Sequence, residues 1–396
     1  MVNMKYAFRG GNIFDGATIR ENAGSVLVEG GRVTGVGASE VAVGFQEISL
    51  NPEMTILPGL IDAFTQLTSP VPGYEWVTES PFRDSARALM SAHLARQMLR
   101  TGITSVADFG DEGGASIALR EAQELGHVTV PRMVSSGRAI HPGVVNGRGR
   151  GFVGVDCVRG AIRRNVKEGA DFVGVVEPFM HSFTAEEVMA AADECRLRGK
   201  WMVFTSMDPD SVAVAVEAGV DGVVSIAVDG KTLRSMAEND VWWAPMGVGI
   251  DPGWVVSGCQ ETGSIQQRMS RMRIHKMLEE APVSLQRART IGVPIIASSG
   301  FPNPLIGLNN CVSSPERLVD VVVALSRVGF SAESALATAT SSAARAMDDK
   351  ELGRISKGMK ADLTVVGGNP GVDLAALRDV HMVMLSGEIV FQRPIR

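Results

Sequence analysis

A glutamate and a histidine four residues apart form the constellation in this sequence best suited to acid/base chemistry. Glu177 and His181 follow an apolar run that ends near Val176, and His141 follows another run that ends near Val134. A carboxylate and imidazoles that reach one substrate can move protons near neutral pH. As a metal site they are poor, because none of the six histidines forms a His-x-His or His-Glu-x-x-His pair. We therefore expect acid/base roles for Glu177, His181 and His141.

Each of these polar residues also has a structural interpretation. Asp108 follows a strand-like run, where a carboxylate serves either catalysis or the cap of the next helix, and we keep it as a catalytic candidate. Asp208 and Asp210 flank a proline ahead of a helical pattern, so capping is the better interpretation there. Glu177 precedes a proline in a loop, where solvation is the alternative, and a loop histidine is more often incidental than functional.

Composition narrows the class of protein. The chain has 396 residues, 45% of them hydrophobic, a net charge of −6 and scattered Lys and Arg. This supports a large core and gives no basic footprint for nucleic acid. No apolar run reaches the roughly 18 to 20 residues of a membrane span, and residues 1–10 contain no signal-peptide core. Four widely spaced cysteines without a Cys-x-x-Cys pair indicate reduced thiols. We expect a cytoplasmic protein with a small-molecule partner, no nucleic acid, no membrane and a homo-oligomeric state left open.

Strand-like and helical patterns alternate through the middle of the chain. The strand-like runs lie at 56–62, 105–109, 130–134, 172–176, 201–205, 222–226, 241–245 and 294–297. Eight such units separated by helices predict an α/β fold whose parallel strands close into a β/α barrel of the TIM type. A doubly wound open sheet is the competitor, but no Gly-x-Gly-x-x-Gly follows the first strand.

Short strands with turn signals occupy both ends of the chain. One hairpin signal is Glu29-Gly30-Gly31-Arg32, and the last 40 residues contain three more strand-like runs. Neither end closes a core alone. We therefore predict a composite β-sandwich domain of residues 1–57 plus 353–396, beside a barrel domain of residues 58–352.

Residues that follow barrel strands form the functional face of such a fold. Several are aromatic or Met, which suits a flat or apolar ligand, although the same side chains also fill a lumen. The loops 251–273 and 299–315 are long and rich in Gly, Pro, Ser and Asn, as in lids or binding loops. The residues expected to contact substrate are Phe64, Gln66, Thr205, Ser225, Trp243, Met246, Trp254 and Ser299.

Three stretches carry a resemblance to a known family. The segment 58–66, Pro-Gly-Leu-Ile-Asp-Ala-Phe-Thr-Gln, resembles the Pro-Gly-Leu-Ile-Asp-x-His-x-His signature of the amidohydrolase superfamily. Residues 101–108 are similar to its Gly-x-Thr-Thr-Val-x-Asp motif, and residues 353–363 to its Gly-x-Ile-x-x-Gly-x-x-Ala-Asp-Leu motif. The imidazolonepropionase-like and prolidase-like members match best. The resemblance implies a barrel with a small β-domain and, in ordinary members, a catalytic metal.

The positions that correspond to the family's metal ligands have lost their ligating side chains. Histidine, lysine and aspartate are expected there by resemblance, with Ser299 as the alternative for the last position, and the residues present are Phe64, Gln66, Gly174, Thr205, Ser225 and Gly300. None is a usual ligand of a divalent ion. The resemblance thus implies a divergent member without the metal, and we expect no cofactor.

Three functions remain open from the sequence. The first is a metal-independent enzyme that uses acid/base groups and hydrogen bonds for isomerisation, cyclisation, elimination or C–N hydrolysis of a small, partly apolar molecule. The second is a noncatalytic small-molecule-binding protein or pseudoenzyme. The third is a metal-dependent amidohydrolase with an unrecognised site.

Overall fold

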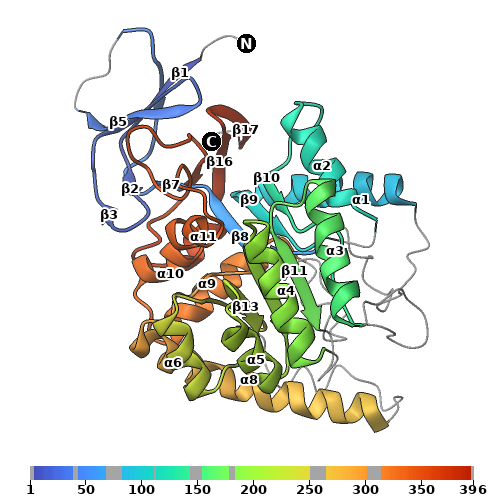
Figure 1. The fold of residues 1–396 in the computed structure, drawn as a ribbon. Helices are drawn as coiled ribbons and strands as arrows, with labels where there is room; N and C mark the ends of the chain where they lie inside the picture. Colours follow the sequence, from blue (N-terminus) through green and yellow to red (C-terminus); the bar gives the residue numbers. More distant parts are fainter. Residues whose placement is uncertain are drawn as a thin grey trace.

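The computed structural model describes residues 4–38, 43–67, 83–110, 113–142, 154–177, 183–249, 265–300 and 314–393. The central part of the chain alternates strands and helices, with the helices outside the strands (Figure 1). This confirms the alternation predicted from the sequence. In the described residues, no helix is both long enough and apolar enough to cross a membrane.

The central strands are parallel and belong to two sheets. One has the order β10-β9-β8 and the other the order β11-β12-β13-β14. Their bounds are β8 Leu60–Thr65, β9 Ile103–Asp108, β10 Arg132–Ser135, β11 Val173–Glu177, β12 Met202–Ser206, β13 Gly222–Ser225 and β14 Trp242–Pro245. Parallel strands share one carboxyl edge, so the residues that follow them gather on one side of the sheet.

Short backbone contacts link the two parallel sheets. Ile140, beyond β10, forms a parallel bridge with Val175 of β11. The predicted eighth strand, 294–297, appears only as a bridge between Ile295 and Trp243, because Pro294 has no N–H to donate to a ladder. On the other side of this segment, Gly300 N–H donates to the carbonyl of Phe64 at 3.0 Å.

Ten α-helices are described, and most of them cover the central strands. They are α1 Asp84–Arg100, α2 Ala115–Glu124, α3 Val155–Glu168, α4 Ala185–Leu197, α5 Pro209–Ala218, α6 Gly230–Glu238, α8 Ile265–Ile291, α9 Arg317–Arg327, α10 Ala332–Thr338 and α11 Ser341–Ala346. The largest apolar cluster joins strand residues such as Val223 to helix residues such as Leu233 and Leu285. A second cluster joins residues on the opposite faces of the strands, among them Ile61, Val203 and Ile296.

Side-chain caps fix where several helices begin. At α4, the Thr184 hydroxyl accepts the N–H of Glu187 while the Glu187 carboxylate accepts the N–H of Thr184, which makes a capping box. Asp208 caps α5 by accepting the N–H of Ser211 at 2.9 Å. The capping interpretation of Asp208 is therefore confirmed, and α4 begins where the sequence predicts a helix.

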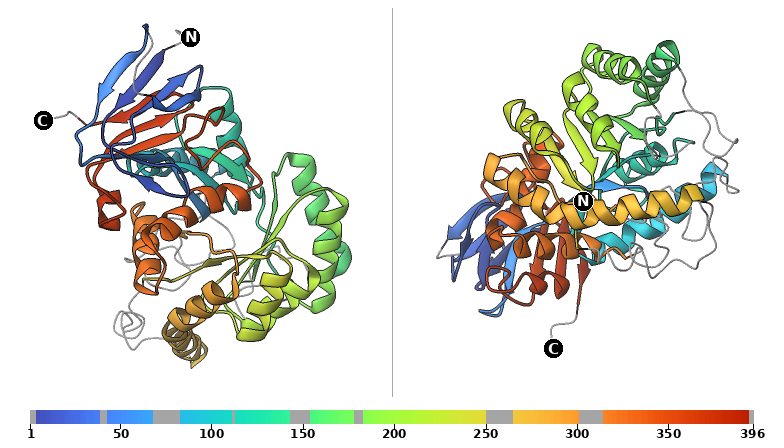
Figure 2. Two further views of the ribbon diagram at one scale, coloured as in Figure 1. Left: turned by 90° about the vertical axis from the view of Figure 1, so that its left-hand side faces the viewer. Right: turned by 90° about the horizontal axis from the view of Figure 1, so that it is seen from below.

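Strands from both chain ends share one sheet, as Figure 2 shows. Its order is β17-β16-β15-β7-β2-β3, formed by β2 Asn12–Phe14, β3 Ile19–Arg20, β7 Thr55–Pro58, β15 Leu363–Val366, β16 Val380–Leu385 and β17 Glu388–Gln392. A short 3-10 helix, Leu374–Arg378, joins β15 to β16.

A four-stranded sheet of the N-terminal part lies beside this six-stranded one. Its order is β5-β4-β1-β6, with bounds β1 Lys5–Arg9, β4 Ser25–Glu29, β5 Arg32–Ala38 and β6 Gln46–Ser49. The predicted hairpin joins β4 to β5, and both of its turn glycines have positive φ, +61° at Gly30 and +77° at Gly31. One apolar cluster takes Phe8 and Val28 from the four-stranded sheet and Val365 and Met384 from the six-stranded one.

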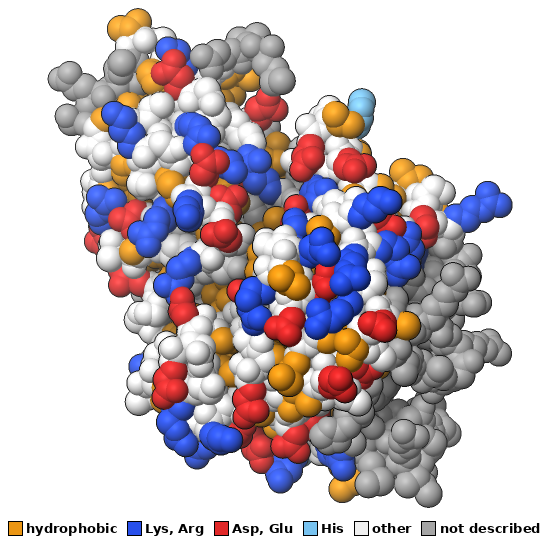
Figure 3. Space-filling view, viewed as in Figure 1, with side chains coloured by type: hydrophobic (Ala, Val, Ile, Leu, Met, Phe, Trp, Pro, Cys, Tyr) orange, Lys and Arg blue, Asp and Glu red, His pale blue; other side chains and the backbone are white. Residues whose placement is uncertain are grey.

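The outer surface of α3 and α4 carries basic side chains interspersed with acidic ones (Figure 3). At its centre lies Glu194, whose side chain is fully buried. Its carboxylate accepts from Arg163 and Arg198 at 2.9 Å and from Arg159 at 3.4 Å. Hydrogen bonds and charge from Arg163, followed by those from Arg198, lower the pKa of Glu194 to about 2. These ion pairs tie α3 to α4.

Candidate active site at the carboxyl ends of the strands

Glu177 is the last residue of β11 and lies at the carboxyl edge of the parallel strands. Its residue surface is 2% exposed. One carboxylate oxygen accepts the hydroxyl of Ser206, at the end of the adjacent β12, at 2.8 Å, and the other accepts the N–H of Phe183 at 3.2 Å. The carboxylate is thus held in place by two neighbouring segments, as a group that accepts a proton in a reaction needs to be.

His141 lies on the same edge, one strand away. It follows Ile140, which pairs with Val175, two residues before Glu177. Its Nδ1 lies 3.3 Å from the carbonyl oxygen of Pro142, and burial lowers the pKa of the imidazole below 6.5. His141 is therefore mostly neutral at pH 7, the form that accepts a proton. The expected partner His181 lies outside the described residues.

Asp108 organises backbone rather than a catalytic pair. It is fully buried at the end of β9, where one carboxylate oxygen accepts the N–H of Leu67 at 2.7 Å and the other accepts the N–H of Gly110 at 2.9 Å. The N-cap position of α2 is occupied by Gly114. These bonds connect the ends of β8 and β9, so Asp108 shapes the edge on which Gln66 is presented.

Asp62 is a buried carboxylate that sequence reasoning did not select. One oxygen, Oδ1, accepts the N–H of Ser299 at 2.9 Å and that of Phe64 at 3.3 Å. The other oxygen, Oδ2, has no hydrogen-bond partner among the described residues. Burial raises the pKa of Asp62 to about 6. The Pro-Gly-Leu-Ile-Asp motif was the signal that marked this residue, but its use as a family signature drew attention to the two positions after it.

Aromatic side chains occupy the inner face of the strands near this edge. The rings of Phe64 and Phe109 are 4.5 Å apart edge to face, and Phe109 lies 5.1 Å from Phe172 in the same geometry. Phe172 in turn stacks on Trp201 at 4.1 Å. All three phenylalanines are fully buried. Only Phe64 was expected here, and it packs within this row, so the lumen-filling interpretation describes its described contacts.

The aromatic row also closes the space beside Gly174. A Cβ atom at this position would lie 3.0 Å from a ring carbon of Phe109 and 3.2 Å from the Ser136 hydroxyl oxygen. Contacts that short require the neighbours to shift. A longer side chain at position 174 would therefore displace Phe109, so the glycine and the ring are a matched pair.

Three neutral polar atoms on this edge are buried without a partner in the described part of the chain. They are Oε1 of Gln66, Oγ1 of Thr205 and Oγ of Ser136. A buried polar atom left unpaired costs free energy, so each is suited to contact water or a ligand. Gln66 and Thr205 were expected to contact substrate. Ser136 was missed, because nothing in its local sequence separates it from an ordinary loop serine.

The remaining expected contact residues lie in different layers. Ser225 and Trp243 are fully buried, and the Trp243 indole N–H donates to the Ser225 carbonyl at 3.2 Å. Trp243 belongs to the apolar cluster that includes helix residues of α6 and α8, which separates it from the row of phenylalanines. Met246 and Ser299 are buried at the strand ends. Trp254 lies outside the described residues.

The described residues do not fit the family's divalent metal. No group of three or more His, Cys, Asp or Glu side chains gathers anywhere in the described ranges. At the six corresponding positions, Thr205, Ser225 and Gln66 offer only neutral oxygens, Phe64 and the two glycines offer none, and the Phe109 ring blocks the place beside Gly174.

Comparison with known proteins identifies the family. The amidohydrolase family model matches residues 55–390, and curated proteins give no match to this sequence. A crystal structure of an amidohydrolase superposes with a TM-score of 0.83 at 23% identity, over 98% of this chain and 100% of that one. A Xaa-Pro dipeptidase with methionine bound in its active site gives 0.78 at 21% identity, over 97% and 99%.

Ochratoxinase from A. niger gives a TM-score of 0.82 at 17% identity, over 98% of this chain and 96% of that one. At such identities the structural likeness establishes the fold, a mixed α/β fold of the TIM-barrel type. The family model, in contrast, is matched by sequence and spans most of the chain. This protein therefore belongs to the amidohydrolase family.

Proposed function

We propose that this protein is a hydrolase that cleaves a C–N bond in a small, uncharged, partly apolar molecule without the family's metal. The observation that carries the proposal is the arrangement of the strand edge, where a fixed carboxylate, Glu177, lies on the same edge as unpaired neutral groups of Gln66 and Thr205. Family membership supports hydrolysis over the isomerisation, cyclisation and elimination that the sequence left open.

In the proposed reaction, Glu177 takes a proton from water as the water oxygen adds to the substrate carbonyl carbon. The hydroxyl of Thr205 donates a hydrogen bond to the carbonyl oxygen, where negative charge develops. The C–N bond then breaks, and the proton passes from Glu177 to the leaving nitrogen. Without a metal to polarise the carbonyl, only an activated bond reacts at a useful rate, such as that of an imide or an anilide.

Substitution of Glu177 tests the catalytic role. Glu177→Gln keeps the hydrogen bond from Ser206 but loses the proton acceptor, so we expect kcat on an anilide such as 4-nitroacetanilide to fall at least about 100-fold. The matched control is Glu186→Gln, an exposed glutamate in the first turn of α4, which should retain full activity. Full activity of a folded Glu177→Gln protein would remove this residue from the mechanism.

Metal content tests the other half of the proposal. We expect protein purified without chelator to contain far less than one zinc, iron or manganese ion per chain, as measured by plasma mass spectrometry. We also expect dialysis against a chelator to leave both activity and Tm unchanged. A stoichiometric metal whose removal abolishes turnover would instead support the metal-dependent alternative.

The second candidate function is noncatalytic binding, as in a pseudoenzyme. It is favoured by the packing of Phe64, Phe109 and Phe172, because three buried rings occupy the inner face where a reacting group would otherwise enter. This function predicts saturable ligand binding with no turnover on any panel of amides, imides and ureas, and no effect of Glu177→Gln on the bound ligand's fate.

The proposed architecture behind this site is a closed barrel of residues 58–352 and a β-sandwich of residues 1–57 plus 353–396. Closure is supported by the hydrogen bonds of segment 294–300 to Trp243 on one side and to Phe64 on the other. The sandwich is supported by the apolar cluster that both terminal sheets share.

A further inference from the structure

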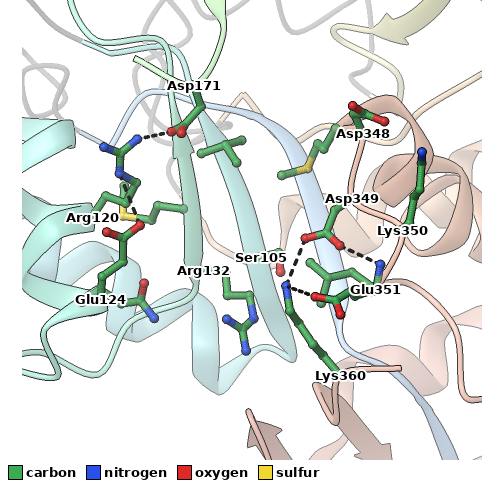
Figure 4. Close-up of a pocket in the computed structure, with 15 residues that line it drawn as sticks. Ser105, Arg120, Glu124, Arg132, Asp171, Asp348, Asp349, Lys350, Glu351 and Lys360 are labelled. Carbon is green, nitrogen blue, oxygen red and sulfur yellow. Dashed lines mark hydrogen bonds and ion pairs between the residues drawn. The ribbon is translucent and has the colours of Figure 1, made fainter. Parts of the chain in front are cut away.

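A second cavity, of about 550 Å³, lies at the opposite end of the strands from the candidate active site (Figure 4). It is lined by Ser105 of β9, by Arg132 and Met133 at the start of β10, by Asp171 ahead of β11, and by residues 347–352 after α11. Because these residues belong to the amino ends of the strands, the cavity is separate from the edge that carries Glu177. Its size falls in the range of small-molecule sites.

The Ser105 hydroxyl is the group in this cavity that most needs a partner. Ser105 is 1% exposed, and its Oγ has no hydrogen-bond partner among the described residues. In Figure 4 it lies at the centre of the lining, between the charged groups on either side. A buried hydroxyl of this kind gains a hydrogen bond from any ligand that brings a carbonyl or amide group to it.

Most charges around the cavity already neutralise one another. Arg120 pairs with Asp171, and Lys360 pairs with Asp349 at 3.4 Å and with Glu351 at 3.2 Å. Arg132, also in the lining, pairs outside it with Asp362 at 2.6 Å. These pairs leave little net charge for a ligand to meet.

Two opposite charges on one rim are the exception. Asp348 and Lys350 are exposed, line the cavity, and form no ion pair within the described ranges. Figure 4 shows both on the segment that follows α11. A carboxylate and an ammonium two residues apart match a ligand that carries the opposite pair of charges on neighbouring atoms, as an α-amino acid does.

The surface between the rim and Ser105 is apolar. Met133, Met347 and Leu352 line the cavity and are buried. Methylene groups of a ligand would cover this surface, and methionine side chains adapt to such contacts. The lining thus offers charge at the rim, apolar contact beyond it and one hydroxyl at the end.

We propose that this cavity binds a free α-amino acid whose side chain ends in an uncharged polar group. Its ammonium contacts Asp348, its carboxylate contacts Lys350, its methylenes cover Met133 and Leu352, and its terminal carbonyl accepts the Ser105 hydroxyl. The proposal is independent of the activity at the strand edge, because the two sites share no residue.

Calorimetric titration of the full chain with L-glutamine tests the proposal. We expect saturable binding, and about five-fold weaker binding of L-norvaline, which lacks the amide. Ser105→Ala should weaken L-glutamine about five-fold and leave L-norvaline unchanged. Lys350→Gln and Asp348→Asn should weaken both ligands about ten-fold, while the control Lys231→Gln, an exposed lysine on α6, changes neither.

Three results would overturn the proposal. One is the absence of saturable heat up to 10 mM L-glutamine, a concentration of about the weakest useful affinity. Another is equal affinity of the wild-type protein for L-glutamine and L-norvaline, a comparison that does not depend on the folding of any variant. The third is binding that Lys350→Gln leaves intact and Phe64→Leu removes, which would assign the ligand to the strand edge.

Discussion

Asp62 shows how one buried carboxylate couples this protein's stability to pH. Burial raises its pKa from 3.8 to about 6. Between these two values the native state binds the proton that the unfolded chain releases, so the free energy of unfolding falls as the pH rises. The contribution is fully present below about pH 4 and is lost once the pH passes about 6.

Asp62→Asn removes this titration. Asn retains an acceptor for the N–H groups of Ser299 and Phe64 but carries no charge. We expect the loss of unfolding free energy between pH 4 and pH 7.5 to shrink by on the order of 3 kcal/mol relative to wild type, as measured by urea denaturation. Asp240→Asn, at an exposed turn position, is the control that should leave the profile unchanged. Equal profiles for Asp62→Asn and wild type would contradict the assignment.

At the residue scale, the sequence predicted chemistry better than environment. The positions of Phe64, Gln66 and Thr205 at strand ends follow from motif and periodicity. The state of Asp62 does not, because it depends on Ser299, which is 237 residues away along the chain. The same holds for Gly174, whose lack of a side chain matters only because the Phe109 ring lies against it.

At the scale of elements, local signals set the helix starts. The sequence from Thr184 to Glu187 has the spacing of a capping box, and both of its hydrogen bonds are formed. Local signals failed at 294–297, where an apolar run predicted a strand and only one bridge is formed. A run of four residues that opens with proline contributes few ladder bonds, whatever its apolar content.

The cap of α4 gives an element-scale prediction. Thr184→Ala removes the hydroxyl that accepts the Glu187 N–H, so we expect the free energy of unfolding to fall by about 1 kcal/mol. Chemical denaturation measures the change. Glu186→Gln, which alters the same turn without touching the capping box, serves as the control and should fall within about 0.5 kcal/mol of wild type. A Thr184→Ala protein as stable as wild type would show that the cap contributes nothing.

At the scale of the whole molecule, the junction between the terminal sheet and the central strands is a two-residue connection. Pro58 ends β7, Leu60 begins β8, and Gly59 lies between them. A Cβ atom on Gly59 would approach within 2.0 Å of the Thr104 hydroxyl oxygen. The glycine in the signature motif is therefore required by the close approach of the neighbouring strand.

Gly59→Ala should accordingly destabilise the whole chain. We expect a loss of about 3 kcal/mol or more in the free energy of unfolding, because the Thr104 side chain and its backbone must shift. Gly59→Ala combined with Thr104→Gly should recover part of the loss. Gly160→Ala, on the exposed face of α3 with no atom near its Cβ position, is the control and should stabilise by about 0.5 to 1 kcal/mol. Destabilisation of both single variants alike would show that the clash is not the cause.

The pairing of β7 with β15 has a consequence for synthesis on the ribosome. Ile56 lies opposite Val365, so about 300 residues separate two neighbouring strands. At translation rates of about 5 to 20 residues per second, β7 waits roughly 15 to 60 s for its partner, with its hydrogen-bonding edge unsatisfied. The nascent N-terminal strands are thus a natural client for a chaperone, and slow translation lengthens their exposure to aggregation.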